Sequence, residues 1–283
     1  MKKNKILVTI FAALLLFNCA GPQKPDPGAD ARLFGSHASS YFTEGNLLSA
    51  LAEYKHAYVA AAKVDLPLLQ AQYLFNIGRV YYELGVLDSA DSAFEAAYRE
   101  LAFYKDEETG RTVAGFIALV YARQGSYDNA FEWYERGRPQ ELKDPESTAF
   151  WLTVQAVVCM VKDRMPEAES YLDRAMISYK KEKKYNGMAQ VDYYRAAIAF
   201  SSANYEDAKQ HLAESLVFLD KAPERYRRWR VLLASATVAF CLHDTDSGQH
   251  FYKRALDCVP KGIALPSDGE VTGCPKKFWE GNK

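Results

Sequence analysis

Five cysteines and five histidines are the residues of this 283-residue chain with the broadest capacity for covalent or metal chemistry. No two histidines stand in an H-E-x-x-H or comparable ligand spacing. The chain also lacks a phosphate-binding glycine loop and a G-x-S-x-G nucleophile turn. The sequence therefore predicts a protein that is not an enzyme, with no metal site and no cofactor.

One short acidic run faintly suggests a calcium-binding loop. Residues 244–248 read Asp-Thr-Asp-Ser-Gly, but the glycine comes one residue early for such a loop. The twelfth position is Ala255, where an EF-hand has a bidentate glutamate. We interpret the run as a turn between two helices.

The cysteines near the C-terminus suggest disulfide chemistry. Cys258 and Cys274 flank a segment rich in proline and glycine. We expect them to form a disulfide that closes a loop of about 16 residues, worth roughly 3 kcal/mol in the chain-entropy model. Cys159 and Cys241 lie in helical segments, where a buried small apolar side chain is the expected role.

The N-terminus has the pattern of an export signal. Three lysines within the first five residues precede Ile6 to Phe17, a stretch of 12 residues that is apolar apart from one threonine. This stretch is too short to span a membrane comfortably. Leu16-Phe17-Asn18-Cys19 then resembles the signal of a bacterial lipoprotein. The alternative is an ordinary secreted protein in which the cysteine occurs by chance.

The lipoprotein resemblance implies a signal peptide over residues 1–18 and a lipid anchor on Cys19. Ala20 follows the cysteine, which in that family favours the outer membrane. Residues 19–30 are rich in proline and glycine and predict a flexible tether. With 35 basic and 36 acidic side chains, the chain lacks the positive excess of a nucleic-acid-binding protein.

The rest of the chain is a helical repeat. Residues 41–57, 81–97 and 121–137 align on a tyrosine, a glycine four residues on, and an alanine five residues further. That alanine position recurs at intervals of 38 to 40 residues through Gly248. Twelve residues before it and seven residues after it, eleven of the twelve side chains are alanine or glycine. Small residues at fixed positions let paired helices approach closely.

This pattern resembles the tetratricopeptide repeat (TPR). The resemblance implies an all-α, right-handed solenoid of about six helix–turn–helix units over residues 31–258, followed by an irregular tail over 259–283. Glycine suits the turn in three units, at Gly45, Gly85 and Gly125. The 40-residue period exceeds the usual 34, which implies longer helices or longer connectors.

In the TPR family, partners bind a concave surface lined by the first helix of each unit. Carried over to this chain, that surface contains aromatic residues and arginines, which are typical of interaction hot spots. These residues are Phe75, Arg79, Tyr82, Arg123, Phe150, Tyr193, Phe200 and Phe240. Such a groove suits a protein or peptide partner. The alternative is that connectors or the tail fill this side, so that the aromatic residues form core.

The sequence thus predicts a membrane-anchored TPR lipoprotein that serves as a protein-interaction scaffold in the bacterial cell envelope. The alternative is a surface lipoprotein that binds a glycan or small molecule through its aromatic groove. Two basic clusters, Lys180–Lys184 and Arg225–Arg230, are interpreted as solvated helix ends, with lipid headgroups as the alternative partner.

Overall fold

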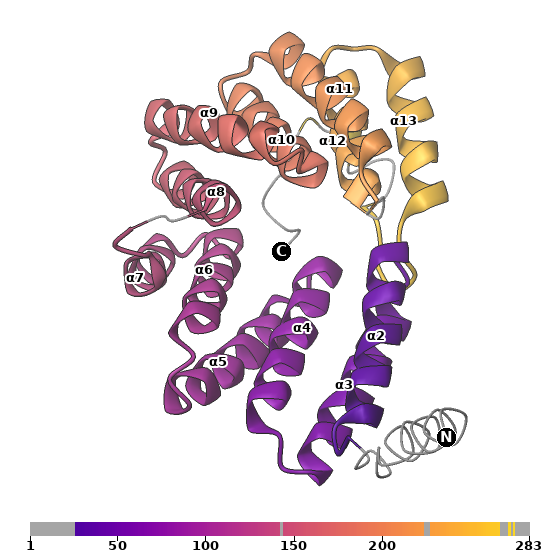
Figure 1. Ribbon diagram of the computed structural model, residues 1–283. Helices are drawn as coiled ribbons and strands as arrows, with labels where there is room; N and C mark the ends of the chain where they lie inside the picture. Colours follow the sequence, from indigo (N-terminus) through magenta and orange to yellow (C-terminus); the bar gives the residue numbers. More distant parts are fainter. Residues whose placement is uncertain (1–25, 142–143, 224–226, 267–270, 273, 275–283) are drawn as a thin grey trace, which may run out of the picture.

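The computed structural model describes residues 26–141, 144–223, 227–266, 271, 272 and 274. Twelve α-helices and no strand occur among these residues (Figure 1). None of these helices has both the length and the apolar composition that a membrane crossing requires. The helices are α2 (Ala29–Glu44), α3 (Leu47–Lys63), α4 (Pro67–Leu84), α5 (Leu87–Phe103), α6 (Glu107–Arg123), α7 (Tyr127–Gly137), α8 (Pro145–Val161), α9 (Met165–Lys181), α10 (Tyr185–Ser201), α11 (Tyr205–Lys221), α12 (Arg228–Cys241) and α13 (Thr245–Cys258).

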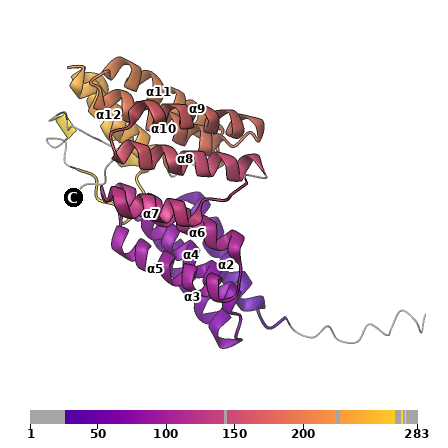
Figure 2. The ribbon, with the colours of Figure 1, turned by 90° about the vertical axis from the view of Figure 1, so that its left-hand side faces the viewer.

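The helices pair in chain order into six hairpins, from α2 with α3 to α12 with α13. Figure 2 shows the hairpins stacked in two halves, with α2–α7 in one and α8–α13 in the other. Most helices have 16 to 18 residues. Longer helices therefore explain most of the 40-residue period. The predicted all-α solenoid of six helix–turn–helix units is confirmed.

The turn inside each hairpin has one conformation throughout. Its central residue has a positive φ in all six hairpins, including Ala203 at 57° and His243 at 61°. The amide two residues past each first helix donates to a carbonyl five residues back, as from Asn204 to Ala199 at 2.9 Å. This bond satisfies a carbonyl that the helix end leaves free. Hydrogen bonding therefore maintains the turn even where glycine is missing, against a steric cost of about 1 kcal/mol.

The small residues of the repeat lie where helices cross. All eighteen positions singled out in the sequence are buried. At Gly78 of α4, an added Cβ atom would lie 2.5 Å from the ring of Phe94 on α5. Since that distance is well inside van der Waals contact, only glycine lets α4 and α5 pack this closely.

The C-terminal tail packs against the first and the last hairpins. Ile263 joins the apolar cluster of α2 and α3, and Gly262 lies beside Leu48. Further along, Val271 is buried against Ala236 and Phe240 of α12. The tail thus connects the two ends of the solenoid, a role that the sequence analysis did not assign to it.

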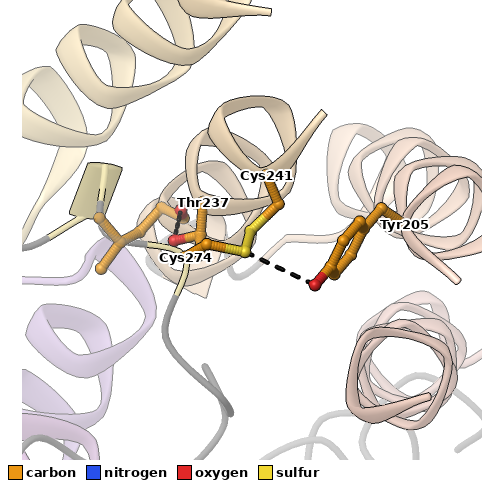
Figure 3. The surroundings of a disulfide bond; sticks show 5 residues. Tyr205, Thr237, Cys241 and Cys274 are labelled. Carbon is orange, nitrogen blue, oxygen red and sulfur yellow. Dashed lines mark hydrogen bonds between the residues drawn. A yellow bond between two sulfur atoms is a disulfide. The ribbon is translucent and has the colours of Figure 1, made fainter. Parts of the chain in front are cut away.

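The tail also carries the disulfide, which joins Cys274 to Cys241 at the end of α12 (Figure 3). The predicted pairing of Cys274 with Cys258 is wrong. The tail passes back along α12, so the Cα atoms of Cys241 and Cys274 lie 5.2 Å apart. The hydroxyl of Tyr205 lies 3.6 Å from the Cys274 sulfur. Cys258 stays at the end of α13 as a free thiol.

Replacement of Cys274 by serine should lower the free energy of unfolding by roughly 3–4 kcal/mol, because the bond constrains a loop of about 33 residues in the unfolded chain. Cys258→Ser is the matched control and should leave stability unchanged. Urea unfolding of the oxidised proteins measures both. Equal losses in the two variants, or a Cys258–Cys274 peptide in non-reducing digests, would contradict the observed pairing.

Candidate binding surface on the inner face of the solenoid

A row of phenylalanine rings crosses the first helices of hairpins two, three and four. The ring centroids of Phe75 and Phe116 are 5.2 Å apart, and those of Phe116 and Phe150 are 5.4 Å apart. Figure 1 shows α4, α6 and α8 on the inside of the curve, with α5, α7 and α9 outside. All three rings are partly exposed. We call Phe75, Phe116 and Phe150 the aromatic row.

The sequence analysis named Phe75 and Phe150 but not Phe116, which links them. The family positions pointed to Gly115 instead. Gly115 supports the row indirectly, because an added Cβ atom there would lie 2.7 Å from the Phe150 ring. The adjacent glycine and phenylalanine were the available sequence signal: the glycine leaves space that an aromatic ring of the next hairpin fills.

Two predicted arginines lie over aromatic rings on the same face. The guanidinium of Arg79 is 4.9 Å from the ring of Phe42 and 5.9 Å from that of Phe75. Arg123 lies 4.7 Å over the ring of Tyr82 and donates a 2.7 Å hydrogen bond to the Tyr82 carbonyl. Cation–π contacts of this kind hold an arginine in place while leaving part of its surface available. Tyr82 itself is buried beneath Arg123.

The strongest polar contact of the inner face closes the curve. Glu83, at the end of α4, accepts hydrogen bonds from Arg227 Nη2 at 2.7 Å and Nε at 3.1 Å. Arg230 Nη1 lies 3.1 Å from the second carboxylate oxygen, and its Nη2 donates to the Glu83 carbonyl at 2.8 Å. These partners are 144 and 147 residues from Glu83 in the chain. The interpretation of Arg227 and Arg230 as solvated was wrong; Arg225 lies outside the described residues.

Glu83 is charged at neutral pH although its side chain is only 5% exposed. Burial alone raises the pKa of this carboxyl, but Arg227 and Arg230 outweigh it and lower the pKa to about 2. Two guanidinium groups thus compensate one buried carboxylate.

A small cavity lies beside this contact, between α4, α10, α11 and α12. It encloses about 60 Å³, which is room for roughly four water molecules. Tyr193, one of the predicted groove residues, lines it together with Tyr194 and Gln190. Burial raises the pKa of both tyrosines, so they stay neutral. The cavity is too small for a peptide in this conformation.

Two predicted groove residues belong to the core. Phe200 is 3% exposed and packs against Tyr205, with ring centroids 5.3 Å apart. Phe240 is 8% exposed and is covered by Val271 of the tail. The prediction that these rings face a groove is corrected for both, since the helix packing and the tail fill that side. The accessible part of the predicted surface is therefore the aromatic row with Arg79 and Arg123.

Comparison with known proteins supports the fold. No family model matches the chain, and no curated protein matches it in sequence. Among solved structures, the Rap conjugation gene regulator of the plasmid pLS20, in complex with the Phr* peptide, is 17% identical with a TM-score of 0.66. That match covers 87% of this chain and 68% of the other.

Two further structures match less of this chain. A Rap protein complexed with Competence and Sporulation Factor is 15% identical, with a TM-score of 0.63 over 83% of this chain and 76% of that one. Aspartyl phosphate phosphatase F from Bacillus subtilis is 12% identical, with a TM-score of 0.59 over 86% of this chain and 64% of that one. At these identities the likeness concerns the fold, which is a TPR-like solenoid.

Glu83→Gln should lower the free energy of unfolding by about 3 kcal/mol at pH 7, since a shift in pKa from 4.5 to about 2 is worth that much. A lowered pKa gives stability that is present above pH 4.5 and is lost as the pH falls toward 2. The difference between variant and wild type should therefore shrink to less than half by pH 3.

Urea unfolding at pH 7, 5 and 3 measures this difference. Glu100→Gln, on the exposed side of α5, is the matched control and should match wild type at pH 7. A gap between Glu83→Gln and wild type that stays constant over this range would contradict a buried, charged Glu83.

Proposed function

We propose that this protein is a lipid-anchored scaffold of the bacterial cell envelope that binds a polypeptide partner on the inner face of its solenoid. The observation that carries the proposal is the aromatic row, three partly exposed rings that run across consecutive hairpins with Arg79 beside them. A surface of this composition anchors a partner through apolar burial and orients it through an arginine. The role is binding and not catalysis.

The solved structures of similar fold support a polypeptide ligand. Two of them are Rap proteins, one in complex with the Phr* peptide and one with Competence and Sporulation Factor. The rings of the aromatic row pack edge-to-face or stack on each other. They offer side-chain-sized gaps between rings more than the open flat ring on which a sugar stacks, so a peptide fits better than a glycan.

The proposed partner lies across hairpins two to four. On the side of hairpins five and six, the Glu83 ion pairs, the buried Phe200 and Phe240, and the tail occupy the inner face. The aromatic row is the continuous apolar surface that remains, which places the contact on α4, α6 and α8.

A photo-crosslinking residue at Gln72 should form an adduct with a polypeptide in living cells. Gln72 is exposed and lies one helical turn before Phe75 on the same face of α4. Arg79→Ala should reduce the adduct, because it removes the charge beside the aromatic row.

The same crosslinker at Arg99, on the outer helix α5, is the control position and should give no such adduct. Absence of an adduct at Gln72, or identical adducts at Gln72 and Arg99, would reject the inner face as the binding surface.

The membrane anchor is the second part of the proposal, and it rests on the lipoprotein-like sequence at Cys19, which lies outside the described residues. We place the protein at the outer membrane on the same basis. Cys19→Ala should release the protein from the membrane fraction, because the acyl chains supply the membrane affinity. Cell fractionation measures this, with Cys258→Ser as the control that stays bound. Unchanged sedimentation of Cys19→Ala would contradict lipid anchoring.

A further inference from the structure

Three ligand-type side chains meet on hairpin five, away from the aromatic row. Asp192 lies on α10, and His211 and Glu214 lie one helical turn apart on α11. One ligand atom from each residue lies within 4.8 Å of the other two. A carboxylate, an imidazole and a second carboxylate are a common donor set for divalent metal ions.

Two of these ligand atoms are buried without a hydrogen-bond partner among the described residues. They are Asp192 Oδ2 and His211 Nδ1. The Asp192 side chain is only 1% exposed, so water does not readily satisfy its second oxygen. Orphaned buried polar atoms are rare because each costs about 1–3 kcal/mol. A cation between the carboxylate and the imidazole would satisfy both atoms at once.

The surrounding charges favour a cation. Arg195 is the nearest positive group, and it bonds the other oxygen of Asp192 at 3.1 Å. Its charge is shared with Asp173, at 2.6 Å, and Glu169, at 3.8 Å. Together with Asp192 and Glu214, four carboxylates face one guanidinium. Arg195 therefore leaves Asp192 Oδ2 free for a metal and fixes the orientation of the carboxylate, as an outer-shell partner does.

We propose that Asp192, His211 and Glu214 bind a divalent transition-metal ion of the Zn²⁺ class. The absence of a thiolate and the presence of one imidazole with two carboxylates suit Zn²⁺ or a similar borderline ion. Glu214 is exposed and His211 is half-buried, which gives the ion a route from solvent. The ion would join α10 to α11 and leave a coordination position for water. This site is independent of the proposed partner binding.

The sequence analysis missed this site because it sought two histidines on one helix. The spacing of His211 and Glu214, three residues apart, is common on helices and has no meaning alone. Asp192 comes 19 residues earlier and reaches them only through the packing of α10 against α11. Knowledge of the hairpin register was needed to place the three residues together.

The test is calorimetric titration of the full-length, tag-free protein in detergent with Zn²⁺ after removal of metals by a chelator. One equivalent should bind and should raise the melting temperature. Co²⁺ should give a visible absorption band for a low-symmetry site with nitrogen and oxygen ligands. His211→Ala and Glu214→Gln, both outside the deep core, should each weaken binding at least tenfold.

His56→Ala is the control, because His56 is an exposed histidine near Glu53 at a different place on the surface. It should leave Zn²⁺ affinity unchanged. Two results would overturn the proposal. One is the absence of saturable binding by the wild-type protein. The other is Zn²⁺ binding that survives both His211→Ala and Glu214→Gln, or that His56→Ala removes, since the ion would then bind elsewhere.

Discussion

The buried carboxylate of Glu83 is the contact on which the shape of this solenoid depends. A stack of helical hairpins has contacts only between neighbours, so its curvature is ordinarily set by many small rotations. Here α4 of the second hairpin meets the start of α12 in the sixth, through Arg227 and Arg230. Because loss of one partner would leave an uncompensated buried charge, separation of the two ends is costly. The tail reinforces the closure at Ile263 and through the Cys241–Cys274 bond.

This closure divides the inner face into two parts. Around α10 and α12, the ion pairs, the tail and the buried rings of Phe200 and Phe240 leave only a cavity of about 60 Å³. Around α4, α6 and α8, the aromatic row remains partly exposed. Since apolar surface left in contact with water favours association, the second part is the one suited to a partner. Fixed curvature also means that this surface is preorganised before binding.

The sequence predicted the local features of the fold and missed the long-range ones. Small residues such as Gly78 and the turn glycines report contacts within one hairpin, where spacing along the chain is spacing in space. The arginines of α12 could not be recognised as partners of Glu83, because their meeting depends on the summed curvature of four hairpins. The same limit explains the wrong pairing of Cys258, the missed Phe116, and the groove role given to Phe240, which the tail covers.

The central claim is that Glu83 holds hairpins two and six together. It is tested most directly by electron-spin distance measurement between spin-label amino acids at Val86 and Lys221, both exposed near the contact. The full-length protein in detergent should give one narrow distance distribution, and Glu83→Gln should broaden it and shift it to longer distances. A distribution that is already broad in the wild-type sequence, or that Glu83→Gln leaves unchanged, would contradict the claim.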